Sequence, residues 1–231
     1  MERIKKFMFE RIGLPAFLKI MELEDSLAHK DNTHSFSSDS PTRFDIPLEF
    51  ARRQGIDMPL RVKITPHILS CMKNMKKAIL ELKNNSQNPR KTIEEDELDE
   101  LHTFIKSLNI SGIGFTRVPQ EFIFEKKAVA YENAIVLAMN MDNEKINTAP
   151  SKKSLKNIWM TYDKLGVVAN KVARYLREKG FASHASHPLG GITLYPRLAE
   201  KAGLGGFGKS GLLITPINAR YETWLNLPEA F

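Results

Sequence analysis

Cysteine is almost absent from the 231-residue chain, which has only Cys71. A single cysteine excludes a disulfide within the chain, a zinc site built from cysteines and an iron–sulfur cluster held by four cysteines of this chain. Long apolar runs are also missing, because none reaches the roughly 18 residues that cross a membrane. Glu10 and Arg11 interrupt the apolar stretch near the N-terminus that a signal peptide would need. We therefore expect a soluble, cytoplasmic protein without an iron–sulfur cluster of its own.

The charge is positive but scattered. The chain has 34 Lys and Arg residues against 27 Asp and Glu residues, a net charge of +7. Neither a basic block nor a basic stripe interleaved with aromatic residues stands out, and nucleic-acid-binding chains usually show one of them. An excess of this kind favours a small anionic ligand, and we do not expect a nucleic-acid partner.

Glycine is concentrated between His187 and Pro216, where seven of the 13 glycines lie. The octapeptide GLGGFGKS, from Gly203 to Ser210, fits both the Walker A pattern and the dinucleotide fingerprint. Both motifs follow a strand and open a helix, whereas here a short helix over 196–202 precedes the glycines and a strand over 211–215 follows. We therefore exclude a nucleotide fold. Two interpretations remain: a glycine turn between a helix and a strand, or a ligand loop in which free N–H groups and Lys209 bind an anion.

The rest of the chain divides into two parts. Residues 1–60 form a helical or irregular N-terminal extension that contains the polar linker 29–45, in which we expect His29 and His34 to be solvated. Residues 61–231 form one domain in which helices and strands alternate, as in a sheet flanked by helices. Thr65 is expected to cap the first helix of this domain, and Thr92 with Glu95 to form the capping box of the second.

Two further segments carry strong patterns. The apolar run 134–139 is typical of a strand that is covered on both faces. The longest helical pattern lies between Pro150 and Gly180, and its apolar residues predict one buried stripe. The stripe consists of Leu155, Ile158, Trp159, Tyr162, Leu165, Ala169, Val172, Ala173 and Leu176. Asp163 is expected to face solvent.

Three motifs together indicate a relationship. They are YLREKGFA at 175–182, PRLAEKAGLG at 196–205 and GKSGLLITP at 208–216. In this order they resemble the cobalamin-binding core shared by epoxyqueuosine reductases and reductive dehalogenases. The resemblance covers roughly residues 93–217, and only the last third of that range contains specific motifs. It implies an α+β, nitroreductase-like fold that holds a cobalamin, with FMN as the alternative cofactor. The cofactor-binding residues that it implies are His187, Gly190, Gly191, Gly203, Gly205, Gly206, Gly208, Lys209 and Thr215.

The chain departs from this family in two ways. The family's ferredoxin-like cysteines are missing from these residues, so electrons would come from a separate donor protein. Thr161 stands where epoxyqueuosine reductases carry a catalytic Asp, and threonine cannot donate a proton as a carboxylic acid does. By resemblance to the dehalogenases, Tyr162 is the candidate catalytic acid, with plain core packing as its alternative role.

Three functional hypotheses follow. The first is a corrinoid-dependent or flavin-dependent reductase-like redox protein. The second is a corrinoid carrier or chaperone without catalysis, and the third is a degenerate scaffold that binds a protein partner. We assign no metal-binding residues.

Overall fold

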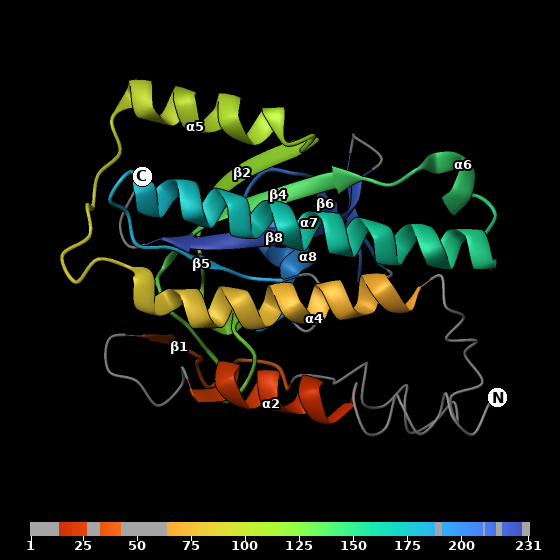
Figure 1. The fold of residues 1–231 in the computed structure, drawn as a ribbon, viewed down its shortest axis with the longest axis horizontal. Helices are drawn as coiled ribbons and strands as arrows, with labels where there is room; N and C mark the ends of the chain where they lie inside the picture. Colours follow the sequence, from red (N-terminus) through yellow and green to blue (C-terminus); the bar gives the residue numbers. More distant parts are fainter. Residues whose placement is uncertain are drawn as a thin grey trace.

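The structure is a computed structural model that describes residues 14–26, 33–42, 64–187, 191–209, 211–215 and 219–227 (Figure 1). The elements in chain order are α2 (Leu14–Asp25), β1 (His34–Ser35), α4 (Thr65–Leu80), η3 (Glu81–Asn84), α5 (Glu95–Ser107), β2 (Gly112–Arg117), η4 (Gln120–Phe122), β3 (Ala128–Val129), β4 (Asn133–Asn140), α6 (Asn143–Ile146), α7 (Lys152–Glu178), β5 (His184–Ala185), α8 (Tyr195–Lys201), β6 (Gly206–Phe207), β7 (Leu213–Ile214) and β8 (Ala219–Leu227). Helices and small sheets are thus mixed, as an α+β class implies.

A four-stranded antiparallel sheet in the order β2-β4-β8-β5 forms the centre of the fold. Strand β4 lies inside the sheet, and its residues from Ala134 to Met139 are buried on both faces. This confirms the prediction from the apolar run. Strand β8 was not predicted, although Tyr, Thr and Trp at 221–224 are typical strand residues. It separates β4 from the two-residue strand β5.

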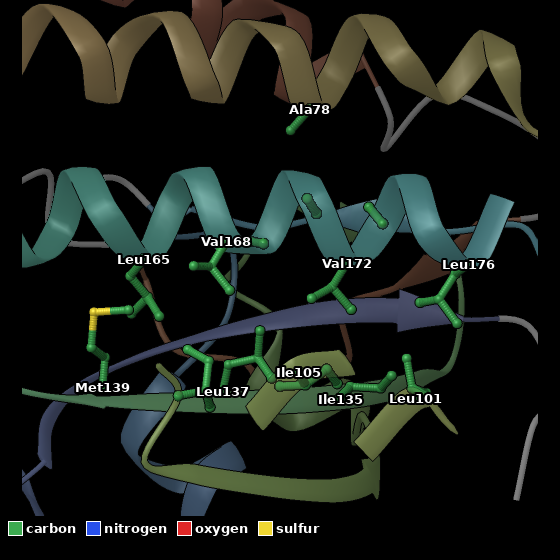
Figure 2. Packing of buried hydrophobic residues seen from close by; sticks show 14 of the residues in the cluster. Ala78, Leu101, Ile105, Ile135, Leu137, Met139, Leu165, Val168, Val172 and Leu176 are labelled. Carbon is green, nitrogen blue, oxygen red and sulfur yellow. The ribbon is translucent and has the colours of Figure 1, made fainter. Parts of the chain in front are cut away.

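The two faces of β4 contact different layers. Ile135, Leu137 and Met139 pack with residues of α5 and α7, as Figure 2 shows for Leu165, Val168, Val172 and Leu176 of α7. Ala134 and Val136 point to the other face, where they cluster with Leu198 and Ala199 of α8. Because alternate residues of a strand point to opposite faces, this alternation places α7 and α8 on opposite sides of the sheet.

Helices α4 and α7 lie side by side, run in the same direction and pair in register (Figure 1). His67 bonds Asp163, Asn170 bonds Asn74, and Arg177 bonds Glu81, and each pair is separated by 96 residues. Successive pairs are seven residues apart, which is two helical turns. This polar ladder fixes the position of α4 along α7, and it shows that the prediction of a solvent-facing Asp163 was wrong.

The buried side of α7 agrees with the predicted stripe only in its second half. Leu165, Ala169, Val172, Ala173 and Leu176 are buried as predicted. In the first half the buried residues are polar: Ser154, Asn157 and Thr161. The expected residues Leu155, Ile158, Trp159 and Tyr162 are only half-buried. Ser154 completes the helix N-cap with Ser151, and the Asn157 amide donates to the Asp142 carbonyl. These partners satisfy the buried polar groups, which the apolar pattern alone did not reveal.

Both predicted caps are shifted. Helix α4 has Ile64 at the N-cap and Thr65 inside the helix. Helix α5 starts after Glu94, and the N–H of Glu94 is bonded by the Glu97 carboxylate, so Thr92 and Glu95 do not form the box. Glu97 also bonds Arg90 with both oxygens, and this contact lowers the pKa of Glu97 to about 2. The capping box of α5 is therefore formed by Glu94 and Glu97, and Arg90 binds the Glu97 carboxylate.

The N-terminal part is described only over 14–26 and 33–42. Helix α2 packs on α4 through Ile20, Met21, Met72 and Met75. His34 is not solvated as expected, because it lies in β1, paired with β3, and its Nε2 is 2.8 Å from the Val118 carbonyl oxygen. His29 and the rest of the proposed extension lie outside the described residues. Within the described part of the chain, no helix combines the length and apolar character that crossing a bilayer requires.

Candidate functional site

The residues with candidate roles fall into two groups on opposite sides of the sheet. Tyr162 and His187 belong to the α7 side, and the glycines from Gly203 onward with Lys209 belong to the α8 side. Gly191 lies at the start of the segment that joins them. Gly190 lies outside the described residues, so the structure says nothing of it.

His187 is buried against α7 at Gly166. The His187 side chain is only 3% exposed, and a Cβ added to Gly166 would lie 1.7 Å from the His187 Nε2. The missing side chain of Gly166 therefore forms the notch that holds the imidazole. Burial lowers the pKa of His187 to about 3, and the nearby Asp163 carboxylate opposes this shift. The imidazole is therefore neutral at physiological pH, with Nε2 directed at the helix.

Tyr195 ties the chain after His187 to the start of α8. Its hydroxyl donates to the His187 carbonyl oxygen at 2.6 Å and lies 2.7 Å from the Ser186 hydroxyl. The phenol ring covers Gly191, where an added Cβ would come within 2.4 Å of ring carbon Cζ. Tyr195 thus connects the His187 position to the second group of candidate residues. It was missed because no sequence motif includes it.

A polar network holds the segment before His187 in place. Asn85 accepts from the Ser183 N–H and donates to the Tyr131 hydroxyl, and the Ser183 hydroxyl donates to the Ala173 carbonyl. His184 follows with 2% exposure, and burial lowers its pKa to about 4. Both histidines of this segment are therefore core residues rather than loop residues.

The glycine-rich stretch forms a helix end and a β-hairpin. Gly203 follows α8 with φ of 77° and donates to the Glu200 carbonyl, as a glycine C-cap does. Strands β6 and β7 then pair, and a Cβ on Gly205 would lie 2.3 Å from the Ile214 carbonyl oxygen. This order of helix, turn and strand agrees with the exclusion of a nucleotide fold.

The expected cradle of free N–H groups is wrong for three glycines. The N–H groups of Gly203, Gly208 and Gly211 donate to backbone carbonyls of Glu200, Leu212 and Gly208. They are therefore not available to an anion. Lys209 is exposed in the hairpin turn and can still supply a cation, while Thr215 is half-buried after β7.

Two residues of α8 anchor the hairpin. The Glu200 carboxylate accepts from the Phe207 N–H at 2.8 Å and from Arg197 at 3.0 Å. The Arg197 guanidinium lies 3.8 Å from the centre of the Phe207 ring. The bond from Phe207, followed by that from Arg197, lowers the pKa of Glu200. The hairpin is therefore held in a defined position relative to α8.

The surface of the hairpin is open and apolar. Added Cβ atoms at Gly203, Gly206 and Gly211 would meet nothing within 4 Å. Leu212 and Ile214 are 62% and 67% exposed, the highest values among the large exposed apolar residues of the described chain. Exposed backbone, two aliphatic side chains and one cation are thus gathered on one small hairpin.

The candidate acid region lies on the first half of α7. Thr161 is buried and its hydroxyl donates to the Asn157 carbonyl within the helix. Tyr162 is half-buried and packs edge-on against Trp159 with ring centres 5.9 Å apart. Among the residues that the structure describes, no cluster of three or more His, Cys, Asp or Glu side chains is arranged to hold a metal.

No protein-family model matches the chain. In sequence, the chain is 38% identical over 85 residues to a tetrachloroethene reductive dehalogenase of Dehalobacter restrictus, a match that covers 36% of this chain and 15% of the relative. A tetrachloroethene reductive dehalogenase of Desulfitobacterium hafniense is 36% identical over 84 residues, again 15% of its length.

The fold matches solved reductive dehalogenases over more of the chain. The catabolic reductive dehalogenase NpRdhA superposes with a TM-score of 0.58 and 12% identity, over 86% of this chain and 32% of that chain. A reductive dehalogenase whose structure suggested a mechanism for B12-dependent dehalogenation matches equally well. The likeness to these structures concerns the fold alone. Over about a third of its length the chain is therefore similar in sequence to reductive dehalogenases, and over most of its length its fold is similar to theirs.

Proposed function

We propose that the chain forms the corrinoid-binding part of a redox protein of the reductive-dehalogenase type, and that it takes electrons from a separate donor. The observation that carries this proposal is that two independent comparisons, one of sequence and one of fold, meet on the same class of proteins. The motifs of the glycine-rich stretch support it, because they resemble the cobalamin-binding core of reductive dehalogenases.

The proposed cofactor contacts come from both candidate groups. They are His187, Gly190, Gly191, Gly203, Gly205, Gly206, Gly208, Lys209 and Thr215. A corrinoid would supply a redox-active cobalt, and the protein would bind it, orient it and limit access of water. The β6–β7 hairpin fits such a ligand in kind, since open backbone and exposed Leu212 and Ile214 suit a flat, largely apolar ring. Lys209 suits the phosphate of its tail.

His187 has a different role in this proposal. Its Nε2 faces α7 at Gly166, so the imidazole ring packs against the helix. Its carbonyl is held by Tyr195, which also covers Gly191. We therefore propose that His187 acts on the cofactor indirectly, by fixing the position of Gly191, and that the Gly191 backbone contacts the cofactor.

Tyr162 is the proposed proton donor. Reduction of a substrate consumes a proton together with electrons, and a phenol hydroxyl can donate a proton in such a step. Thr161 cannot take this role, because its hydroxyl is already donated within the helix.

A separate electron donor is part of the proposal. The one cysteine, Cys71, is buried, and burial raises the pKa of its thiol to about 12. A four-cysteine cluster that served this protein would therefore take its ligands from outside these 231 residues.

Titration with cofactor tests the proposal. The protein is purified without oxygen and titrated with cobalamin and, separately, with FMN, while the visible spectrum is recorded. Lys209→Glu is expected to weaken cobalamin binding about tenfold, because reversing one exposed ion pair changes the binding free energy by about 1.4 kcal/mol. Lys91→Glu, an equal charge change at another exposed lysine, is expected to leave it unchanged.

The outcomes separate the alternatives. Binding of cobalamin with turnover by an external low-potential reductant supports the reductase, and binding without turnover supports a carrier. Binding of FMN alone replaces the corrinoid by a flavin. If neither cofactor binds, the proposal is overturned in favour of a scaffold for a protein partner.

A further inference from the structure

The outer side of the α4–α7 layer is strongly basic. All of its cations are exposed side chains, and we call them together the basic face: Lys73, Lys76 and Lys77 on α4, and Lys152, Lys153, Lys156, Lys164, Lys171 and Arg174 on α7. On α7 the cations from Lys153 to Arg174 are spaced by three, seven or eight residues, which correspond to one or two helical turns, so they share one side of the helix. The sequence suggested a scattered excess of charge, and the parallel packing of two distant helices gathers part of it.

Acidic residues do not balance this face. Helix α4 contains none, and α7 contains only Asp163 and Glu178. Asp163 is 19% exposed and bonds His67, while Glu178 lies at the end of α7, 3.5 Å from Arg174. Glu81 lies 3.4 Å from Lys77 but also bonds Arg177. Lysines one turn apart repel each other, and a negatively charged partner would relieve that repulsion.

We propose that the basic face docks the acidic surface of an electron-donor protein. This inference rests on the proposed function, which requires such a donor. Charge complementarity steers association and fixes the orientation of two proteins, which a transient electron-transfer contact needs.

Exposed aliphatic residues among the cations favour a protein over a polyanion. Leu69 and Leu80 of α4 are 50% and 46% exposed, and Val167 of α7 is 36% exposed. Protein interfaces combine apolar contacts with a charged rim, whereas a phosphate backbone is bound through charges and hydrogen-bond donors. A membrane surface would require a continuous apolar face, and the continuous apolar faces of α4 and α7 are already packed inside the protein.

The basic face lies one helix away from the His187 segment. Val167 is exposed on the outer side of α7, and its neighbour Gly166 contacts the buried His187 on the inner side. A donor on the basic face would therefore be separated from the His187 segment by one helix, about 10 Å in diameter. The glycine hairpin lies across the sheet, so changes on the basic face leave it untouched.

The test measures binding of an acidic plant-type [2Fe–2S] ferredoxin by titration calorimetry. The variant K156E/K164E/K171E reverses three charges of the face, and K91E/K106E/K201E makes the same change at three exposed lysines elsewhere. We expect the face variant to bind the ferredoxin at least about tenfold more weakly than the control, and the wild type to lose about tenfold in affinity between 50 and 300 mM salt through screening. Thermal unfolding verifies that both variants are folded.

Other results overturn the inference. Equal ferredoxin binding by the two variants refutes docking on this face. Tighter binding of duplex DNA, or of phosphatidylserine vesicles, with the same dependence on the three lysines would make the face a site for those polyanions instead. Cobalamin titration distinguishes failure of the docking from failure of the proposed function. If the wild type and the face variant bind cobalamin equally and the wild type binds no ferredoxin, only the docking is refuted. If the wild type binds no cofactor, the proposed function is refuted.

Discussion

Gly166→Ala tests how the structure holds His187. The added Cβ would lie 1.7 Å from the His187 Nε2, so the ring must leave its notch. Forcing a methyl group into a packed core costs about 1–3 kcal/mol, and often more when the overlap is this deep. Alanine recovers about 1 kcal/mol over glycine in a helix. We therefore expect the free energy of unfolding at pH 7 to fall by about 1–2 kcal/mol.

The pH dependence of stability identifies the ring as the cause. The pKa of His187 is lowered in the folded protein to about 3, below the value near 6.5 in the unfolded chain. Between these values the unfolded chain binds the extra proton, so stability is fully present above pH 6.5 and declines as the pH falls. His187 should contribute about 1.4 kcal/mol per pH unit to this decline between pH 6 and 5. Expelling the ring restores an ordinary pKa and removes that contribution, while His184 continues to make its own.

Urea unfolding between pH 5 and 7 measures both effects, and NMR titration of the imidazole follows the His187 pKa directly. The double variant G166A/H187A is the control, because without the ring the alanine meets no clash. In the H187A background, G166A should stabilise the helix by about 1 kcal/mol, which reverses the sign of its effect. A single G166A variant that is as stable as the wild type and keeps the low pKa of His187 would show that Gly166 does not hold the ring.

Two further predictions concern the polar anchors. Arg177→Met removes the 10%-exposed partner of Glu81 and leaves that carboxylate with only the more exposed Lys77, so we expect a loss of about 2–3 kcal/mol in urea unfolding. Arg174→Met, at an exposed pair with Glu178, should change stability by less than about 0.5 kcal/mol, and equal effects of the two variants would count against the ladder. Glu200→Ala should speed amide hydrogen exchange at Phe207 without affecting the core. In the wild type the same loosening should appear as the pH falls through the lowered pKa of Glu200, since the ionised carboxylate is the acceptor. Unchanged protection of the Phe207 amide in the variant would show that this anchor is dispensable.

The sequence predicted the elements whose apolar periodicity is contained within the element itself. The apolar run of β4 and the long periodicity of α7 are such cases, and both were found within a few residues of the expected bounds. The glycine after α8 was likewise predicted by its role as a cap, because only the preceding helical turn determines that role.

Contacts between distant segments explain what the sequence did not reveal. Asp163 was expected in solvent because its partner His67 is 96 residues away. The buried polar residues of α7 depend on Asp142 and Ser151, which precede the helix, and β8 acquires its place only by pairing with β4 and β5. One signal was present: a glycine inside a strong helical pattern costs about 1 kcal/mol, so Gly166 indicated a close approach by another part of the chain.

The candidate site was predicted only in part, because its arrangement also depends on contacts between distant segments. The motifs led to the hairpin and to His187, and the structure describes where all but one of these residues lie. It also divides them between two faces of the sheet and adds Tyr195 as the link. Which N–H groups are free could not be inferred from composition, because it depends on the hairpin register that pairs Gly206 with Ile214.

Binding of cobalamin to the wild-type protein is the most direct test of the central claim. Oxygen-free protein is dialysed to equilibrium against cobalamin, and bound corrinoid is measured by its visible spectrum. We expect one corrinoid per chain with a shifted spectrum, and we expect Lys209→Glu to weaken this binding and Lys91→Glu to leave it unchanged. A protein that retains no cobalamin under these conditions would show that the chain does not form a corrinoid-binding site.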